Sequence, residues 1–320
     1  MSRVCRGSVA GRCKFPAGLP QVVRRSAMPH NPKPTMQILI TGANGQLGTE
    51  MRTLSEAHPA HTYFFTDVAE LDITSREAVH TFVRDNAIDL IVNCAAYTNV
   101  DKAEEDEPTA LRINAEAVEN LATAGAKVIH VSTDYVFSGE GWIPCRESDP
   151  VAPRTAYGRT KLAGEETLLA HRPDAVILRT AWLYSPYGNN FVKTMIRLGL
   201  ERDTLGVVFD QVGTPTYAAD LAAAIFTVIE APEWHAGIYH FTNEGVCSWF
   251  DFTVEIHRQY NLLHDDAIQC QVNPILSTAY QYKTPRPHYS VLDKSKYKET
   301  FGVPVPYWTE ALHRCLKAME

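Results

Sequence analysis

A short apolar run followed by three glycines constrains the fold more than any other part of the sequence. The run from Met36 to Ile40 suits a buried strand, and the residues after it contain Gly42, Gly45 and Gly48 in the pattern G-x-x-G-x-x-G. Because glycine has no Cβ, Gly42 and Gly45 allow a tight turn against a pyrophosphate, and Gly48 allows a helix to pack closely on the strand. Free N–H groups at the helix start would bind the anion. The segment predicts a dinucleotide-binding βαβ unit; the alternative is a plain tight connection.

The alternation of strands and helices continues through the first half of the chain. Further strands are predicted at 63–65, 90–93, 128–132 and 175–178. Helices are predicted at 75–86, 107–124 and 157–171. This alternation predicts an α/β protein with a doubly wound parallel sheet of the Rossmann type. Residues 36–184 are expected to form this NAD(P)-binding domain, with a later return around residues 206–235.

The pattern becomes less regular after Trp182. Strands are predicted at 206–209 and 238–242, and helices at 218–230, 249–260 and 307–319. We expect residues 185–320 to form mainly a smaller, mixed α/β substrate-binding domain. Such a domain would cover the carboxyl edge of the sheet, where ligands of open α/β sheets bind.

Composition excludes several classes of function. No apolar run reaches the roughly 18 residues that would suit a membrane span, so no membrane partner is expected. The seven cysteines are scattered and lack metal-ligand spacing, which favours a reducing, cytoplasmic setting. Seven of the 30 basic residues lie within residues 1–35, and the remainder carries 23 basic against 37 acidic residues. This acidic excess argues against nucleic acid as a partner.

The first 35 residues form a basic, proline-containing leader with no helical or strand periodicity. We expect it to be disordered. Either it is an organelle transit sequence or the start is over-long, because Met28 and Met36 both precede the first strand closely. The absence of a serine-rich amphipathic pattern favours the over-long start.

Residues after the second and third strands are candidates for contact with the cofactor. Asp67 ends the run 63–67, where a carboxylate would hydrogen-bond the adenosine ribose; the alternative is an ordinary turn aspartate. A carboxylate there repels a 2′-phosphate, which argues for tolerance of NADH. Asp72 and Ile73 are expected beside the adenine. Ala95 and Ala96 follow the next strand. Small residues there allow the chain to pass beneath the cofactor; the alternative is that they simply pack in the core.

Tyr157 and Lys161 stand four residues apart, so on a helix they share one face. A neighbouring ammonium is expected to lower the pKa of the phenol toward the working pH, where proton transfer is most efficient. The alternative is an amphipathic surface helix. Ser132 and Thr133 end the preceding strand, where a hydroxyl would reach a carbonyl oxygen that also contacts Tyr157. Taken with the glycine turn, these residues predict a hydride-transfer site.

From Met36 to about Met319 the chain resembles the dTDP-4-dehydrorhamnose reductase family of the extended short-chain dehydrogenase/reductase superfamily. The resemblance is carried by ordered strings that include G-Q-L-G (45–48), V-N-C-A-A-Y-T-N-V-D-K-A-E (92–104), S-T-D-Y-V-F (132–137), Y-G-R-T-K-L-A-G-E (157–165), R-T-A-W (179–182) and D-Q-V-G-T-P-T (210–216). It implies NAD(P)H-dependent reduction of the C4 keto group of dTDP-4-dehydro-β-L-rhamnose to dTDP-L-rhamnose, a nucleotide sugar.

The resemblance also implies roles for individual residues. Thr133, Tyr157 and Lys161 match the catalytic trio. The expected cofactor-binding residues, besides Tyr157 and Lys161, are Gly42, Asn44, Gly45, Gln46, Leu47, Gly48, Asp67, Asp72, Ile73, Ala95, Ala96 and Thr98. The expected substrate-binding residues are Asn99, Val100, Thr133, Tyr135, Trp182, Asn190 and Arg286. From the sequence, Trp182 could equally be core, and Arg286 either pairs with the diphosphate or is a solvated surface residue.

Some relatives hold a divalent metal such as Mg²⁺ at a dimer contact. Glu50 matches one ligand, but the position that matches another is Ala219. No metal ligand is therefore assigned, Glu50 is expected to be a carboxylate on a helix surface, and monomer and homodimer both stay open.

Two other functions are compatible with this fold. One is a non-catalytic regulatory subunit that resembles the beta subunit of methionine adenosyltransferase; the intact Thr133, Tyr157 and Lys161 argue against it. The other is a different nucleotide-sugar enzyme, either a reductase or a 4-epimerase.

Overall fold

The computed structural model describes residues 35–265, 267–280 and 282–320. The predicted leader, residues 1–35, lies outside the described residues apart from Thr35. Among the described residues, no helix is both long and apolar enough to cross a membrane.

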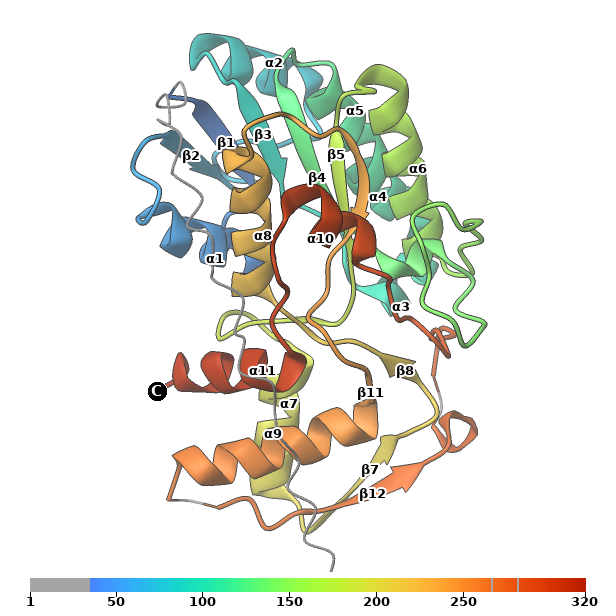
Figure 1. The fold of residues 1–320 in the computed structure, drawn as a ribbon. Coiled ribbons are helices and arrows are strands. Elements are labelled where there is room, and N and C mark those ends of the chain that lie inside the picture. Colours follow the sequence, from blue (N-terminus) through green and yellow to red (C-terminus); the bar gives the residue numbers. More distant parts are fainter. Residues whose placement is uncertain (1–34, 266, 281) are drawn as a thin grey trace, which may run out of the picture. The chain divides into compact units, whose positions relative to one another are not determined.

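Six parallel strands form the central sheet (Figure 1), in the spatial order β10-β5-β4-β3-β1-β2. Their bounds are β1 (Gln37–Thr41), β2 (Thr62–Thr66), β3 (Leu90–Asn93), β4 (Lys127–Thr133), β5 (Val176–Thr180) and β10 (Gly237–His240). The predicted Rossmann-type sheet is confirmed. The chain order reverses between β1 and β3, because β2 lies on one side of β1 and β3 on the other. Open sheets of this class bind ligands at such a switch point.

Successive residues of β1 show why the sheet is covered on both faces. Ile38 and Ile40 pack in one apolar cluster with α1 (Gln46–Ser55) and α8 (Ala218–Glu230). Leu39 points the other way, into a cluster with α2 (Arg76–Asp85), α5 (Ala117–Ala122) and α6 (Ala156–His171). Side chains alternate across a strand, so a continuously apolar strand requires cover on both faces.

The predicted helix at 107–124 is interrupted in the structure. It consists of α4 (Glu107–Leu111), a π-helical turn (Arg112–Glu116) and α5, and it follows the short α3 (Val100–Glu105). Within the π turn the side chain of Asn114 accepts a hydrogen bond from the N–H of Tyr97 at 2.8 Å and donates one to its carbonyl at 3.1 Å. The turn therefore holds the loop that follows β3. Such π turns frequently occur at functional sites.

Most of the remaining elements form a third apolar cluster beyond the carboxyl edge of the sheet. Its main elements are α7 (Phe191–Glu201), β7 (Thr204–Val208), α9 (Trp249–Leu263), β12 (Gln271–Ile275) and α11 (Trp308–Lys317). Short elements complete the described part: β6 (Leu183–Tyr184), β8 (Val212–Gly213), β9 (Thr216–Tyr217), β11 (Cys247–Ser248) and α10 (Ser295–Phe301). The strand predicted at 206–209 corresponds to β7, which pairs with β12 and not with the central sheet. The division into domains at residue 184 stays a prediction.

Candidate active site

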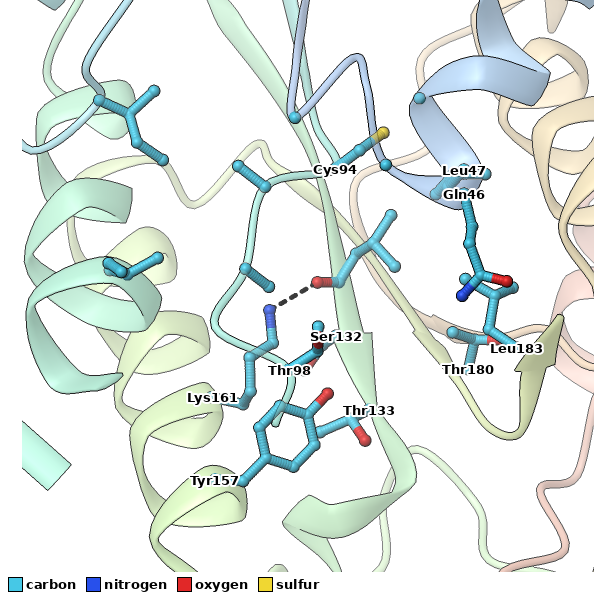
Figure 2. Close-up of a pocket in the computed structure, with 18 of the residues that line it drawn as sticks. Gln46, Leu47, Cys94, Thr98, Ser132, Thr133, Tyr157, Lys161, Thr180 and Leu183 are labelled. Atoms are coloured by element: carbon cyan, nitrogen blue, oxygen red, sulfur yellow. Dashed lines mark hydrogen bonds between the residues drawn. The ribbon is translucent and has the colours of Figure 1, made fainter. Parts of the chain in front are cut away.

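A cleft of about 740 Å³ opens at the switch point, over the carboxyl ends of β1, β3, β4 and β5. Figure 2 shows residues from these strand ends and from α6 converging on it. Twelve of the predicted cofactor-binding residues line the cleft along with Thr133, Tyr135, Val100 and Trp182: Gly42, Gly45, Gln46, Leu47, Gly48, Asp67, Asp72, Ile73, Ala95, Ala96, Thr98 and Tyr157. Lys161 lines it too. The tertiary structure therefore brings together most of the residues selected from the sequence.

The glycine turn has no room for larger residues. Gly42 has φ +64°, and a Cβ on it would lie 2.7 Å from the Cα of Ala95 at the end of β3. A Cβ on Gly48 would lie 2.3 Å from the carbonyl oxygen of Gly42. Gly45 is the N-cap of α1 and provides no side-chain cap, so the first N–H groups of the helix remain available to a ligand. These features fit a bound pyrophosphate.

Asp67 is held in place by the glycine turn itself. Its carboxylate accepts hydrogen bonds from the N–H of Asn44 at 3.0 Å and of Val68 at 2.8 Å. Asn44 does not line the cleft but supports it through this contact. Asp72 accepts two hydrogen bonds from Thr74, which hold the pKa of its carboxyl below the usual range. Asp67 therefore presents a carboxylate at the end of β2, at the position expected for a ribose contact.

Tyr157 lies in the first turn of α6, which begins where Thr155 caps the helix. Figure 2 shows its ring beside Thr133 at the end of β4. The predicted lowering of its pKa is wrong for this structure: burial raises the pKa of the Tyr157 phenol to about 12, and the hydrogen bond with Thr133 opposes this only in part. The phenol is therefore protonated at neutral pH, which is the state required of a proton donor.

The amine of Lys161 contacts groups other than that phenol, and the dashed line in Figure 2 joins it to a backbone carbonyl oxygen. Its Nζ donates to the carbonyl oxygen of Val131 at 2.7 Å and lies 3.1 Å from Nε2 of His130. Burial lowers the pKa of Lys161 to about 8. The prediction failed because helical spacing places two residues on one face without deciding where a long side chain ends.

The hydroxyl of Thr133 is already hydrogen-bonded within the protein. It donates to Oδ1 of Asp134 at 3.0 Å and accepts from the N–H of Tyr135 at 3.2 Å. Burial raises the pKa of Asp134 to about 7. When Asp134 is protonated, it can donate to Thr133 and leave the threonine proton free for a ligand. Asp134 also lines the cleft, and the sequence analysis did not select it.

A second hollow of about 530 Å³ adjoins the cleft and shares Tyr135 and Trp182 with it. The indole of Trp182 stacks on Trp249, with ring centres 3.4 Å apart. Arg286 lines this hollow and pairs with Asp101 at 2.8 Å. Its Nη1 is buried without a hydrogen-bond partner among the described residues. Arg286 is thus a partly buried cation with donor capacity left for a ligand.

Two predicted substrate contacts have other roles in the structure. Asn99 caps α3 by accepting a hydrogen bond from the N–H of Lys102. Asn190 caps α7 and donates to Oε1 of Gln46 at 3.0 Å. Neither lines the cleft or the adjoining hollow. Asn190 instead links Gln46, next to the glycine turn, to the C-terminal part of the chain.

Several cleft residues were missed by sequence reasoning. Thr180 ends β5 and Ala181 and Leu183 follow it, so the rule that ligands bind at strand ends would have found them. Arg112 and Ile113 lie in the π turn, and no sequence signal marked that turn. The position of these two residues depends on a distortion within a predicted continuous helix.

Glu50 corrects another expectation, because it is buried and not on a helix surface. It is 6% exposed, and burial, reinforced by nearby Asp220, raises its pKa to about 7. Ala219, the other position considered for a metal, supplies no ligand. Within the described ranges, no group of three or more His, Cys, Asp or Glu side chains is arranged to hold a metal ion.

The parallel sheet, the glycine turn and the Tyr157–Lys161 helix together are typical of short-chain dehydrogenases/reductases. The model of the RmlD substrate binding domain family matches residues 36–320. The protein belongs to this family.

Curated relatives and solved structures agree with that assignment. The dTDP-4-dehydrorhamnose reductase of Aggregatibacter actinomycetemcomitans is 39% identical over 291 residues, which cover 86% of this chain and 97% of the relative. A dTDP-4-dehydrorhamnose reductase structure from Clostridium acetobutylicum is 44% identical, with a TM-score of 0.84 and coverage of 89% and 99%. The Bacillus anthracis structure, a complex with NADP, is 38% identical, with a TM-score of 0.83 and the same coverage.

Proposed function

We propose that the protein is a dTDP-4-dehydrorhamnose reductase, which reduces the C4 keto group of dTDP-4-dehydro-β-L-rhamnose to give dTDP-L-rhamnose. The observation that carries the proposal is the position of the protonated Tyr157 phenol beside Thr133, in a cleft that begins at an uncapped glycine turn. The names of the relatives supply the substrate.

The cleft is suited to a nicotinamide cofactor. The uncapped start of α1 would bind the pyrophosphate, Asp67 would face the adenosine ribose, and Lys161 would lie nearest the nicotinamide end. The hydroxyl of Ser132 is buried in the cleft with no hydrogen-bond partner among the described residues, so it too has capacity for a ligand. When bound, the reduced nicotinamide would supply the hydride. We propose that NADH and NADPH both serve: Asp67 would repel a 2′-phosphate and so favours NADH, and the Bacillus anthracis relative forms a complex with NADP.

Two residues of the protein would protonate and hydrogen-bond the oxygen of the keto group. Tyr157 would donate its proton to the C4 oxygen as that oxygen becomes negative. Thr133 would donate a hydrogen bond to the same oxygen once its hydroxyl turns from Asp134. Both groups come from rigid elements, β4 and the first turn of α6, so little reorganisation is needed.

The adjoining hollow would hold the nucleotide part of the substrate. In the described part of the chain, Arg286 Nη1 is buried without a hydrogen-bond partner, which suits a charge-assisted hydrogen bond to a diphosphate oxygen. The stacked Trp182 and Trp249 provide aromatic surface beside it. An apolar wall with few polar groups is the usual form of a small-molecule site.

The test is an assay of cofactor oxidation with a panel of 4-keto nucleotide sugars. Each sugar is mixed with NADH or NADPH, and the absorbance of the reduced nicotinamide is followed. We expect a fall with dTDP-4-dehydro-β-L-rhamnose and none with dTDP-L-rhamnose, the matched sugar that lacks the keto group. No oxidation with any keto sugar would support a regulatory subunit, and turnover without added cofactor would support a 4-epimerase.

A further inference from the structure

A buried row of polar side chains extends behind Lys161 into the sheet. It runs from Thr41 on β1 through Asn93 on β3 and His130 on β4 to Lys161 on α6, and each is at most 1% exposed. Asn93 Nδ2 lies 2.9 Å from Nδ1 of His130, and Nε2 of His130 lies 3.1 Å from Nζ of Lys161. Solvent does not reach these contacts, so each must match a donor with an acceptor.

The orientation of the Asn93 amide is determined by a backbone group. Its Oδ1 accepts from Thr41 Oγ1 at 2.7 Å and from the N–H of Ala95 at 3.2 Å. A backbone N–H only donates, so the atom that faces Ala95 must be the carbonyl oxygen. The NH₂ of Asn93 therefore faces His130.

This orientation determines the tautomer of His130. An amide NH₂ only donates, so Nδ1 of His130 must accept, and the neutral ring then carries its proton on Nε2. Burial lowers the pKa of His130 well below its usual range, so the ring stays neutral. The Nε2–H group is directed at Lys161.

An ammonium group has three donors and no acceptor, whereas a neutral amine has a lone pair that accepts from Nε2–H. We propose that His130, oriented by Asn93, is a positioning residue that favours the neutral amine of Lys161. The amine then accepts from His130, donates one N–H to Val131 and keeps the other for the cleft. The lowering of the Lys161 pKa by burial acts in the same direction.

The remaining charged neighbours of Lys161 do not oppose this assignment strongly. Glu165, one turn further along α6, favours the ammonium form, but its carboxylate is bound by Arg179 through contacts of 2.6 to 3.2 Å. From the π turn, the cation Arg112 lines the same cleft. Amine and ammonium are therefore both accessible near neutral pH, where a group exchanges protons most effectively.

The consequence for the reaction rests on the proposed function. Keto reduction consumes one proton, which Tyr157 gives to the substrate oxygen and which water must replace. In the proposed reaction the ammonium form of Lys161 supports that step, so we expect kcat to fall as pH rises through the pKa of Lys161. Asn93→Asp supplies a carboxylate that accepts from Nδ1–H, so Nε2 becomes an acceptor and the ammonium is stabilised.

Two measurements test the proposal. The first is ¹⁵N NMR of histidine-labelled protein, with His130→Gln to assign the signal. We expect His130 to carry its proton on Nε2 at neutral pH; a ring protonated on Nδ1 or on both nitrogens overturns the proposal. This experiment needs neither substrate nor a folded Asn93 variant, so its result is independent of the proposed function.

The second measurement is the pH profile of kcat. In Asn93→Asp we expect the alkaline limb to move up by about one pH unit or more. Thr41→Val is the matched control, because it removes a neighbour of the same amide while Ala95 still orients it; its limb should not move. An unchanged limb in Asn93→Asp contradicts the proposal even if the enzyme is fully active.

Discussion

The two sides of the cleft are assembled in different ways. On the cofactor side, Gly42, Gly45 and Gly48 lie within seven residues that run from the end of β1 into the first turn of α1, and backbone atoms form the surface. On the substrate side, Trp182, Trp249 and Arg286 come from three distant segments, and side chains form the surface. A backbone site can thus be specified by a few adjacent residues, whereas a side-chain site requires the whole fold to bring its members together.

Several side-chain contacts join these sides. Among them, Asn190 donates to Gln46 at 3.0 Å, and Arg286 pairs with Asp101 at 2.8 Å. Each joins a residue of the C-terminal part to a residue that follows a strand of the sheet. Changes on one side should therefore affect one ligand much more than the other, unless they break these contacts.

The largest effect is expected where the two sides meet, at Tyr157. Tyr157→Phe removes the proton donor and keeps the ring, so kcat should fall by roughly 10²-fold to 10⁴-fold while cofactor affinity stays within about twofold. Steady-state kinetics and cofactor titration by fluorescence measure the two effects. A near-normal kcat in the variant would exclude Tyr157 as the acid.

The next effect concerns the backbone-built side. In Gly48→Ala the added Cβ would lie 2.3 Å from the Gly42 carbonyl oxygen and 2.5 Å from the Cα of Ala43. The turn must shift, so we expect a loss of about 1–3 kcal/mol in the free energy of unfolding, measured by urea denaturation, together with loss of cofactor binding.

Gly45→Ala is the matched control for that change. A Cβ on Gly45 would have the Gly42 carbonyl oxygen as its nearest neighbour, at 3.2 Å. The φ of −75° at Gly45 suits any residue. The variant should retain most of its stability. Equal destabilisation of the two variants would show that the turn is not limited by space at Gly48.

A smaller effect should separate the substrate side from the cofactor side. Arg286→Gln removes the partly buried cation and should raise KM for the nucleotide sugar by roughly tenfold, as expected for a charge-assisted hydrogen bond. KM for the cofactor should not change. Lys283→Gln is the control, because the ion pair of Lys283 with Glu105 is exposed. A rise in both KM values for Arg286→Gln would contradict the division of the cleft.

The smallest effect is a difference in acid sensitivity. Burial, with the nearby charge of Arg179, lowers the pKa of His240 on β10 to about 3. The unfolded chain takes up a proton below the ordinary histidine pKa of 6.5 and the folded protein does not. The stability that His240 contributes is therefore present above that pH and is lost as pH falls toward 3.

In numbers, lowering the pH from 6.5 to 5.5 should cost about 1 kcal/mol through this residue. Urea denaturation at both pH values should show that the free energy of unfolding falls less in His240→Gln than in the unmodified protein. His257→Gln, in the C-terminal cluster, is the comparison: its pKa is also lowered by burial, but less. If both variants reduced the acid-induced loss of stability equally, the sheet and the C-terminal cluster would not differ in acid sensitivity as proposed.

Much of the fold could be predicted because its determinants are local. The continuous apolar strands required cover on both faces, and Ile40 and Leu39 indeed pack into separate clusters. The glycine turn and Tyr157 were found for the same reason, since short-range spacing defines a turn and a helix face. The pairing of β7 with β12 was not predicted, because strand pairing depends on segments more than sixty residues apart.

Side-chain environments could not be predicted in the same way. The burial of Glu50 and the raised pKa of Tyr157 depend on the number of atoms that surround each group. Trp182 has φ +49°, a conformation that favours glycine, and its stacking on Trp249 was not visible in the spacing of residues. Each case arises from packing between elements, which no local pattern records.

The sequence by itself therefore determined the order of the central strands, the glycine turn and the residue types available for catalysis. Those features follow from backbone geometry and from the period of apolar residues. Only the tertiary structure decided that Lys161 points to Val131 and His130 and not to Tyr157. The physical reason is that protonation and direction depend on which donors, acceptors and apolar atoms surround a group, and these come from strands that are distant in the chain.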